Sequence, residues 1–91
     1  MWRITYKKVF LHELKELPKD IRPQVENFVF NDLPSAENPL TLNQVKKLIG
    51  YNIYYRVRFG DYRVGLIIDQ HEKTVQCCRV KHRKDIYRFF P

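Results

Sequence analysis

Residues 53–68 read IYYRVRFGDYRVGLII, and this stretch decides the fold. Apolar and polar side chains alternate on both sides of Gly60-Asp61, with the period of two of a strand that has one buried face. Glycine at the first central position suits a two-residue type II′ turn. We therefore predict a β-hairpin of strands 53–59 and 62–68, whose core face carries Ile53, Tyr55, Val57, Phe59, Tyr62, Val64, Leu66 and Ile68.

The register of this hairpin gathers three arginines on the face that points away from the core. Arg58 pairs with Arg63, and Arg56 pairs with Gly65 about 6.6 Å further along the strand. Like charges opposite one another disfavour strand pairing, whereas an anion between them removes the repulsion. Guanidinium groups bind phosphate oxygens in a bidentate manner, and Gly65 leaves room for a ligand. The pattern favours an anion site, with ordinary solvated arginines as the alternative.

The rest of the chain supplies the elements around the hairpin. Residues 7–17 and 20–33 carry apolar stripes of helical period, and 2–6 and 74–80 alternate as strands do. We predict an α+β fold in the order β-α-α-β-β-β, with a small antiparallel sheet and a helical hairpin packed on one face. We also expect a loop at 34–39, a helical turn within 40–49, a short helical or irregular tail from 81 onward, and one domain over residues 1–91.

Charge restricts the class of partner. The chain has 17 Lys and Arg against 10 Asp and Glu, a net charge of +7. Residues 1–50 contribute +2 and residues 51–91 contribute +5. A basic balance of this size favours a polyanion, although a generic basic surface is the alternative. Apolar runs are too short for the roughly 20 residues of a membrane span, and no signal-peptide pattern follows Met1, so we expect no membrane contact and a cytoplasmic location.

Cysteine and histidine add little chemistry. Cys77 and Cys78 are adjacent, so on a strand they point to opposite faces and build no disulfide framework. The three histidines show no zinc-ligand spacing with them. We expect neither a metal site nor a cofactor.

The tail VKHRKDIYRFF, residues 80–90, places cations among aromatic rings. Cations bind phosphates and rings stack on exposed bases, so this mixture is typical of RNA contact. Histidine is the residue type whose unperturbed pKa lies nearest neutrality, so His82 is a candidate for proton transfer, with Lys81 as a weaker one. Tyr87 is expected to stack or donate a hydrogen bond, while Phe89 and Phe90 suit either the core or a partner. The candidate RNA-binding residues are Lys81, His82, Lys84 and Arg88.

Three motifs resemble the RelE/ParE toxins in order and spacing: KLIG at 47–50, YRVRFGDYRV at 55–64 and VKHRKDIY at 80–87. The ending, with His-Arg and a tyrosine four residues later, is more similar to RelE-type ribonucleases than to ParE-type gyrase poisons. This resemblance implies a type II toxin that cleaves mRNA in the ribosomal A site without a metal, by 2′-hydroxyl attack on the adjacent phosphate. It also implies a cognate antitoxin in a hetero-oligomer and five catalytic residues: Arg56, Arg58, Arg63, Arg83 and Tyr87.

One departure from the family bears on the mechanism. Cleaving members often carry lysine where this chain has Arg56 and Arg58. Arginine is effectively always protonated, so neither residue serves as a general base, and the sequence identifies no other. Two other functions stay open: a ParE-type poison of DNA gyrase, and a cleavage-inactive relative that binds only antitoxin or RNA.

Overall fold

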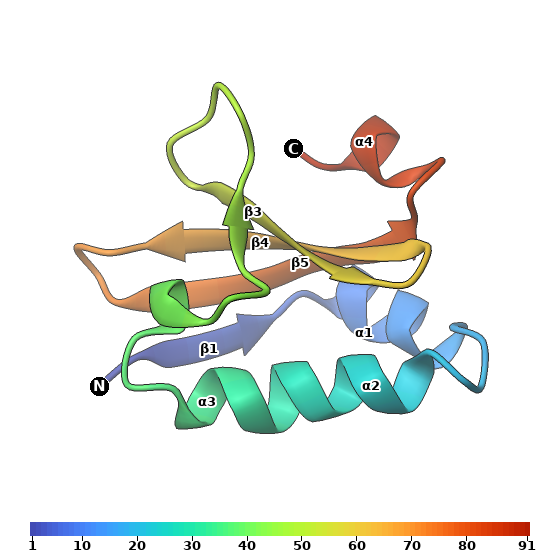
Figure 1. Ribbon diagram of the computed structural model, residues 1–91, viewed down its shortest axis with the longest axis horizontal. Coiled ribbons are helices and arrows are strands. Elements are labelled where there is room, and N and C mark those ends of the chain that lie inside the picture. Colours follow the sequence, from blue (N-terminus) through green and yellow to red (C-terminus); the bar gives the residue numbers. More distant parts are fainter.

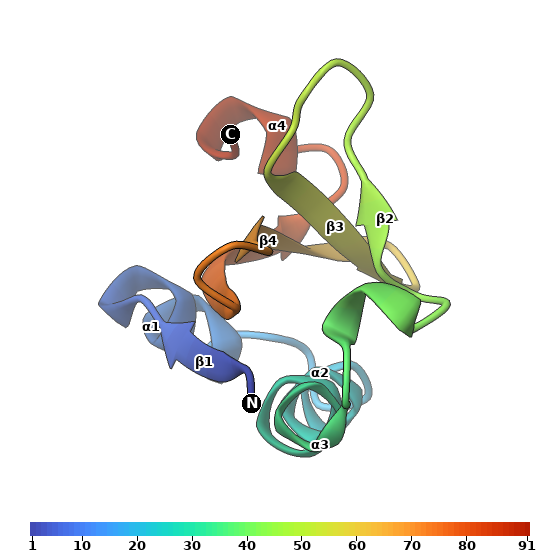
Figure 2. The ribbon, with the colours of Figure 1, turned by 90° about the vertical axis from the view of Figure 1, so that its left-hand side faces the viewer.

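A computed structural model describes residues 1–91 as a mixed five-stranded sheet between two sets of helices (Figure 1). The strands lie in the order β1-β5-β4-β3-β2. Figure 2 shows α1, α2 and α3 on one side of the sheet and α4 on the other. No helix has the length and apolar composition needed to cross a bilayer. The strands are β1 (Arg3–Tyr6), β2 (Lys46–Lys47), β3 (Tyr54–Phe59), β4 (Tyr62–Asp69) and β5 (Thr74–His82); the helices are α1 (Lys8–Lys15), α2 (Arg22–Asn27), α3 (Leu33–Ser35) and α4 (Ile86–Phe89).

The predicted hairpin is confirmed in its register. Strand β3 pairs with β4 so that Arg58 lies opposite Arg63 and Arg56 opposite Gly65. Gly60 has a φ of 58°, as the first central position of a type II′ turn requires. Ile53 was wrongly assigned to the core face, because it precedes β3 and is 42% exposed. The other predicted core positions are buried or pack against the core.

The sheet is mixed, so the prediction of a wholly antiparallel sheet was wrong in this detail. Strand β1 runs parallel to β5, with Ile4 opposite Val75. A period of two tells which face of a strand is buried but says nothing of its direction or its neighbour. Strand direction here follows from the path of the chain through α1, α2 and α3, which returns it to the far edge of the sheet.

Residues 40–49 also differ from the prediction of a helical turn. Only Pro39–Thr41 forms a turn of 3₁₀ helix, and Lys46–Lys47 forms strand β2. Strand β2 pairs with β3, and the Leu48 N–H donates to the Tyr54 carbonyl. Pairing satisfies backbone groups along β3 that an edge strand would leave open, while Val45 enters the core.

The predicted helical hairpin covers the main core. Residues 22–35 form one continuous helix, whose hydrogen bonds widen to a π pattern over Phe28–Asp32 between α2 and α3. Its apolar stripe and that of α1 face the sheet, as their periods predicted. The buried stripe residues are Phe10, Leu14, Leu17, Val25, Phe28, Val29 and Leu33.

A smaller apolar cluster lies on the opposite face, under α4. The cysteines point to opposite faces as predicted, because Cys77 belongs to the main core and Cys78 packs with Ile86 and Phe90. Phe90 fills the space above Gly65: a Cβ atom at Gly65 would lie 2.5–2.8 Å from the Phe90 ring. Our expectation that Gly65 leaves room for a ligand was therefore wrong, since the chain's own tail occupies that room.

A buried carboxylate completes the edge of β5. Strand β1 pairs with β5 only as far as Cys77, so beyond it the edge has no strand partner. Glu13 of α1 takes that place, because its Oε1 accepts the Val80 N–H at 3.1 Å. The same carboxylate binds Arg79 at 2.6 Å and Lys81 at 3.3 Å. Burial alone would raise the pKa of Glu13, but the hydrogen bonds from Arg79, Val80 and Lys81 outweigh it and hold that pKa below its ordinary value.

Replacing Glu13 should destabilise the fold in a pH-dependent way. We expect Glu13→Gln to lower the free energy of unfolding at pH 7 by about 2 kcal/mol, the scale of losing charge-assisted hydrogen bonds to a buried group. The folded pKa is depressed, so this stability is present above the unfolded value, near 4.5, and is lost as pH falls through the lower folded value. Urea unfolding of both proteins from pH 7 to 3 should show the difference shrinking. Glu16→Gln is the control, since Glu16 is 70% exposed. An equal loss of unfolding free energy in Glu16→Gln would contradict the role of Glu13 at the edge of β5.

A second change tests the packing of the tail. We expect Gly65→Ala to cost about 1–3 kcal/mol, the usual range for overpacking, because the new methyl group displaces the Phe90 ring. In a Phe90→Ala background the same change should cost less than about 0.5 kcal/mol, as a double-mutant cycle between contacting residues predicts. Equal costs in the two backgrounds, measured by urea unfolding, would show that the methyl group meets something other than Phe90.

Candidate functional site

Basic side chains form two rows across the sheet face that α4 partly covers. Residues paired across neighbouring strands project from the same face, so the strand register defines each row. One row lies near the hairpin turn and the other lies two residues further along the strands. The rows are Arg58–Arg63–Lys81 and Lys46–Arg56–Gly65–Arg79.

The cations at the β5 end of both rows have an anionic partner inside the protein. Arg79 and Lys81 share the Glu13 carboxylate, and both cations also lie over the ring of Phe89, at 4.7 and 4.9 Å from its centre. Attraction between a cation and the face of an aromatic ring adds to the ion pair. Lys81, a predicted RNA-binding residue, is thus engaged within the protein.

The β2–β3 end of the rows is open. No ion pair of the chain includes Lys46, Arg56, Arg58 or Arg63. The Arg63 guanidinium donates to the Gly60 carbonyl at 2.7 Å and to the Tyr62 carbonyl at 3.0 Å. These hydrogen bonds orient the guanidinium without neutralising its charge. Partial burial lowers the pKa of Arg63, and repulsion by Arg58, then by Arg56 and Arg83, lowers it further. The register agrees with this repulsion, because Arg58 lies directly opposite Arg63 on the paired strand.

A hollow of about 350 Å³ lies on this open end. It is lined by Gln44, Lys46, Arg56 and Arg58, with no acidic and no apolar side chain. The site predicted from the sequence includes neither Gln44 nor Lys46, because a helical turn is predicted within 40–49. The Lys46-Lys47 doublet just before the hairpin was the available signal, but only the pairing of β2 shows which lysine faces Arg56.

The tail brings two further predicted residues to the hairpin end of this face. The Arg83 N–H donates to the Asp61 carbonyl at 2.7 Å, and its Nε lies 3.7 Å from the Asp61 carboxylate. Tyr87 is 56% exposed on α4 and lies in the neighbourhood of Arg63. Backbone contacts between the tail and the turn therefore keep Arg83 beside the arginines of β3 and β4.

Of the three remaining tail residues, two are exposed and one faces the other side of the sheet. Lys84 and Arg88 are exposed, and Arg88 reaches Asp85 at 4.0 Å. His82 follows Lys81 on the strand and so points to the other side, where its ring packs edge-on against Tyr62. Its Nδ1 accepts the Lys84 N–H at 3.1 Å.

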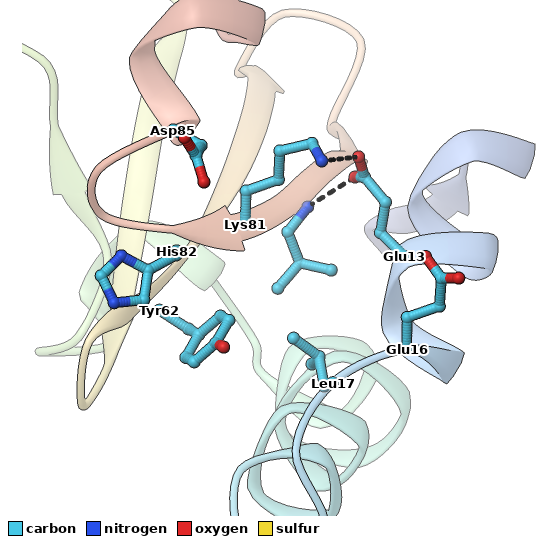
Figure 3. A pocket seen from close by; sticks show the side chains of 8 residues that line it. Glu13, Glu16, Leu17, Tyr62, Lys81, His82 and Asp85 are labelled. Carbon is cyan, nitrogen blue, oxygen red and sulfur yellow. Dashed lines mark hydrogen bonds and ion pairs between the residues drawn. The ribbon is translucent and has the colours of Figure 1, made fainter.

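His82 instead borders a separate hollow of about 210 Å³ between β5 and α1 (Figure 3). The Glu13 carboxylate and the Lys81 ammonium meet across one wall, and Glu16 and Asp85 add acidic groups to it. This mixed lining differs from the purely basic and amide lining near Lys46. The structure thus separates the candidate proton-transfer histidine from the open arginines.

Comparisons with known proteins agree with this architecture. The family model described as "ParE toxin of type II toxin-antitoxin system, parDE" matches residues 4–87. Toxin RelE3 of Methanocaldococcus jannaschii is 36% identical over 93 aligned residues, covering 98% of this chain and 99% of the relative. Toxin RelG of Mycobacterium tuberculosis is 37% identical over 78, covering 84% of each.

Solved structures share the fold along nearly the whole chain. One chain of the RelB-RelE antitoxin-toxin complex from Methanococcus jannaschii superposes with a TM-score of 0.76 and 32% identity, covering 96% of this chain and 99% of that one. A chain of the RelBE2 toxin-antitoxin complex from Mycobacterium tuberculosis gives 0.69 and 29%, covering 90% and 98%. On this agreement of sequence, fold and motif, the chain belongs to the RelE/ParE superfamily of toxins from type II toxin-antitoxin systems.

Proposed function

We propose that this toxin is a metal-independent endoribonuclease that cleaves mRNA in the ribosomal A site, and so acts in the cytoplasm. The observation that carries the proposal is the open end of the basic rows, where Arg56, Arg58 and Arg63 have no carboxylate partner. A protein that binds no anion there would keep repulsion that costs stability. The names of the relatives, Toxin RelE3 and Toxin RelG, support the RelE-type reading.

The reaction is an internal transfer at phosphorus. The 2′-oxygen bonds to the adjacent phosphorus, and the bond to the 5′-oxygen of the next nucleotide breaks. The products are a 2′,3′-cyclic phosphate and a 5′-hydroxyl; one proton leaves the 2′-hydroxyl and one reaches the departing oxygen. The five-coordinate phosphate carries extra negative charge, and Arg56, Arg58 and Arg63 stabilise it through guanidinium hydrogen bonds.

The tail supplies the remaining roles in this proposal. Arg83, beside the turn, stabilises the leaving oxygen, and Tyr87 stacks on or orients a nucleotide. The exposed Lys84 and Arg88 bind the RNA backbone. Lys81 and His82 join them only if RNA loosens the Glu13 ion pair or reaches the other side of β5.

Arginines do not remove protons, so this chain contributes charge stabilisation and orientation rather than a strong base. The ribosome then supplies part of the activation by holding the mRNA in line for attack.

A cognate antitoxin is the proposed regulator. The two solved relatives described above come from toxin-antitoxin complexes. The net charge of +5 over residues 51–91 suits a partner segment that combines acidic with apolar residues. Such a segment would neutralise the open arginines and exclude RNA from them.

The main rival is a gyrase poison, because the matching family model is named for ParE. A poison of this type binds DNA gyrase as a protein ligand and needs no cleavage site. We expect expression of this toxin to halt translation first and to leave mRNA cut in frame with codons. Pulse labelling of protein and DNA synthesis, with mapping of RNA 5′ ends, measures both. Early arrest of DNA synthesis with intact mRNA would establish the rival function.

Neutralising one open arginine should separate activity from stability. We expect Arg58→Gln to leave the melting temperature unchanged or slightly higher, because repulsion falls, and to lower single-turnover cleavage on programmed ribosomes by about 10²-fold or more. Arg63→Gln should lower cleavage similarly, with a stability change within about 1 kcal/mol, because it also loses hydrogen bonds to the turn.

Arg3→Gln is the matched control, since Arg3 is exposed on β1 at the far edge of the sheet. It should cleave normally. Folded Arg58→Gln that cleaves at the wild-type rate would remove this face from the active site.

A further inference from the structure

We propose that Gln44 and Lys46 form a second phosphate subsite, which binds the RNA backbone phosphate next to the one that is cut. The inference rests on the proposed endoribonuclease function and extends it to a segment outside the predicted site. Its basis is the hollow beside β2, whose lining combines these two residues with Arg56 and Arg58.

The chemistry of the hollow favours an anion. Lys46 lies directly opposite Arg56, and Arg58 is two residues along the same strand. Like charges placed opposite one another on paired strands repel, and no carboxylate relieves them. Two guanidinium forks, one ammonium and one amide can all donate hydrogen bonds to phosphate oxygens.

The strand register separates this subsite from the cleavage position. Arg58 and Arg63 share the row near the turn, which Arg83 also approaches, whereas Lys46 belongs to the row about 6.6 Å further along. On the β4 side the second row is closed, because Phe90 occupies the space above Gly65. The second row is therefore open only toward β2.

A continuous polyanion fits this layout better than separate carboxylates do. Arg56 and Arg58 border the hollow and also belong to the proposed cleavage site. An anion in the hollow therefore lies next to the phosphate in the cleavage site. Single-stranded nucleic acid presents its phosphates in such a series and follows basic grooves along its backbone. Acidic side chains of an antitoxin are the competing occupant.

The test compares Lys46→Gln with Lys47→Gln. The two variants remove the same charge from the same strand, but Lys47 pairs with Tyr55 and so lies on the opposite face. We expect Lys46→Gln to raise the toxin concentration for half-maximal cleavage on programmed ribosomes about 10-fold, the scale of one charge-assisted contact, with the maximal rate within about 2-fold of wild type. The slope of log affinity against log salt should fall by about 0.7, as for one lost phosphate contact on a single strand. Lys47→Gln should match wild type, and Lys46→Arg should restore binding.

Neutralising the RNA identifies the contact. Programmed mRNAs carry an uncharged methylphosphonate at the phosphate on one side or the other of the cut. At one of the two positions, we expect the methylphosphonate to weaken binding of the wild-type toxin by the same factor as the Lys46→Gln substitution does. The same methylphosphonate should not weaken binding of the Lys46→Gln variant further, because the substitution and the methylphosphonate remove the two partners of one contact.

The other results overturn the inference. The first is an equal effect of Lys46→Gln and Lys47→Gln on the concentration for half-maximal cleavage. The second is that the effect of Lys46→Gln adds fully to that of the methylphosphonate at both positions. The third is that Lys46→Gln weakens antitoxin binding and leaves cleavage unchanged, which would make the hollow a carboxylate site. If wild-type toxin cleaves and Lys46→Gln matches Lys47→Gln, only the subsite fails. If wild-type toxin does not cleave, the proposed function fails and the subsite with it.

Discussion

The Glu13 carboxylate holds the parts of this protein together. Strand β1 leaves the edge of β5 after Cys77, and Glu13 then accepts the Val80 N–H in place of a neighbouring strand. A buried carboxylate is stable only when hydrogen bonds and opposite charges compensate its lost hydration. Arg79 and Lys81 provide that compensation, so one residue of α1 ties the helix to the edge of β5 and orients two of its cations.

This arrangement divides a basic sheet face into two halves that differ in how their charges are paired. On β5 the cations Arg79 and Lys81 bind Glu13, and the ring of Phe89 packs over both of them, so these cations position the C-terminal tail. On β2 and β3 the cations have no anionic partner inside the protein, and their mutual repulsion persists until an external anion arrives. On this face, the cations without an anionic partner inside the protein therefore lie together, away from Glu13.

The tail links these halves to the hairpin. Phe90 packs above Gly65, and the Arg83 N–H donates to the Asp61 carbonyl, so α4 is attached at both ends. Arg83 and Tyr87 therefore adjoin the arginines of β3 and β4, while His82 turns to the other side of the sheet. With arginine at 56 and 58, the chain is suited to binding and stabilising negative charge rather than to removing protons.

The sequence by itself determined the hairpin register, the buried stripes of α1 and α2 and the shared face of Arg56, Arg58 and Arg63, because side-chain period and turn chemistry are local properties. Only the tertiary structure decided which distant segments meet. The parallel pairing of β1 with β5, the strand at Lys46, the seat of Phe90 above Gly65 and the burial of Glu13 all join residues far apart in the chain. The periodicity of the side chains defines which face of an element is buried, but it does not define which element packs beside it. The neighbour depends on the path of the whole chain and on the buried polar groups that still need a hydrogen-bond partner.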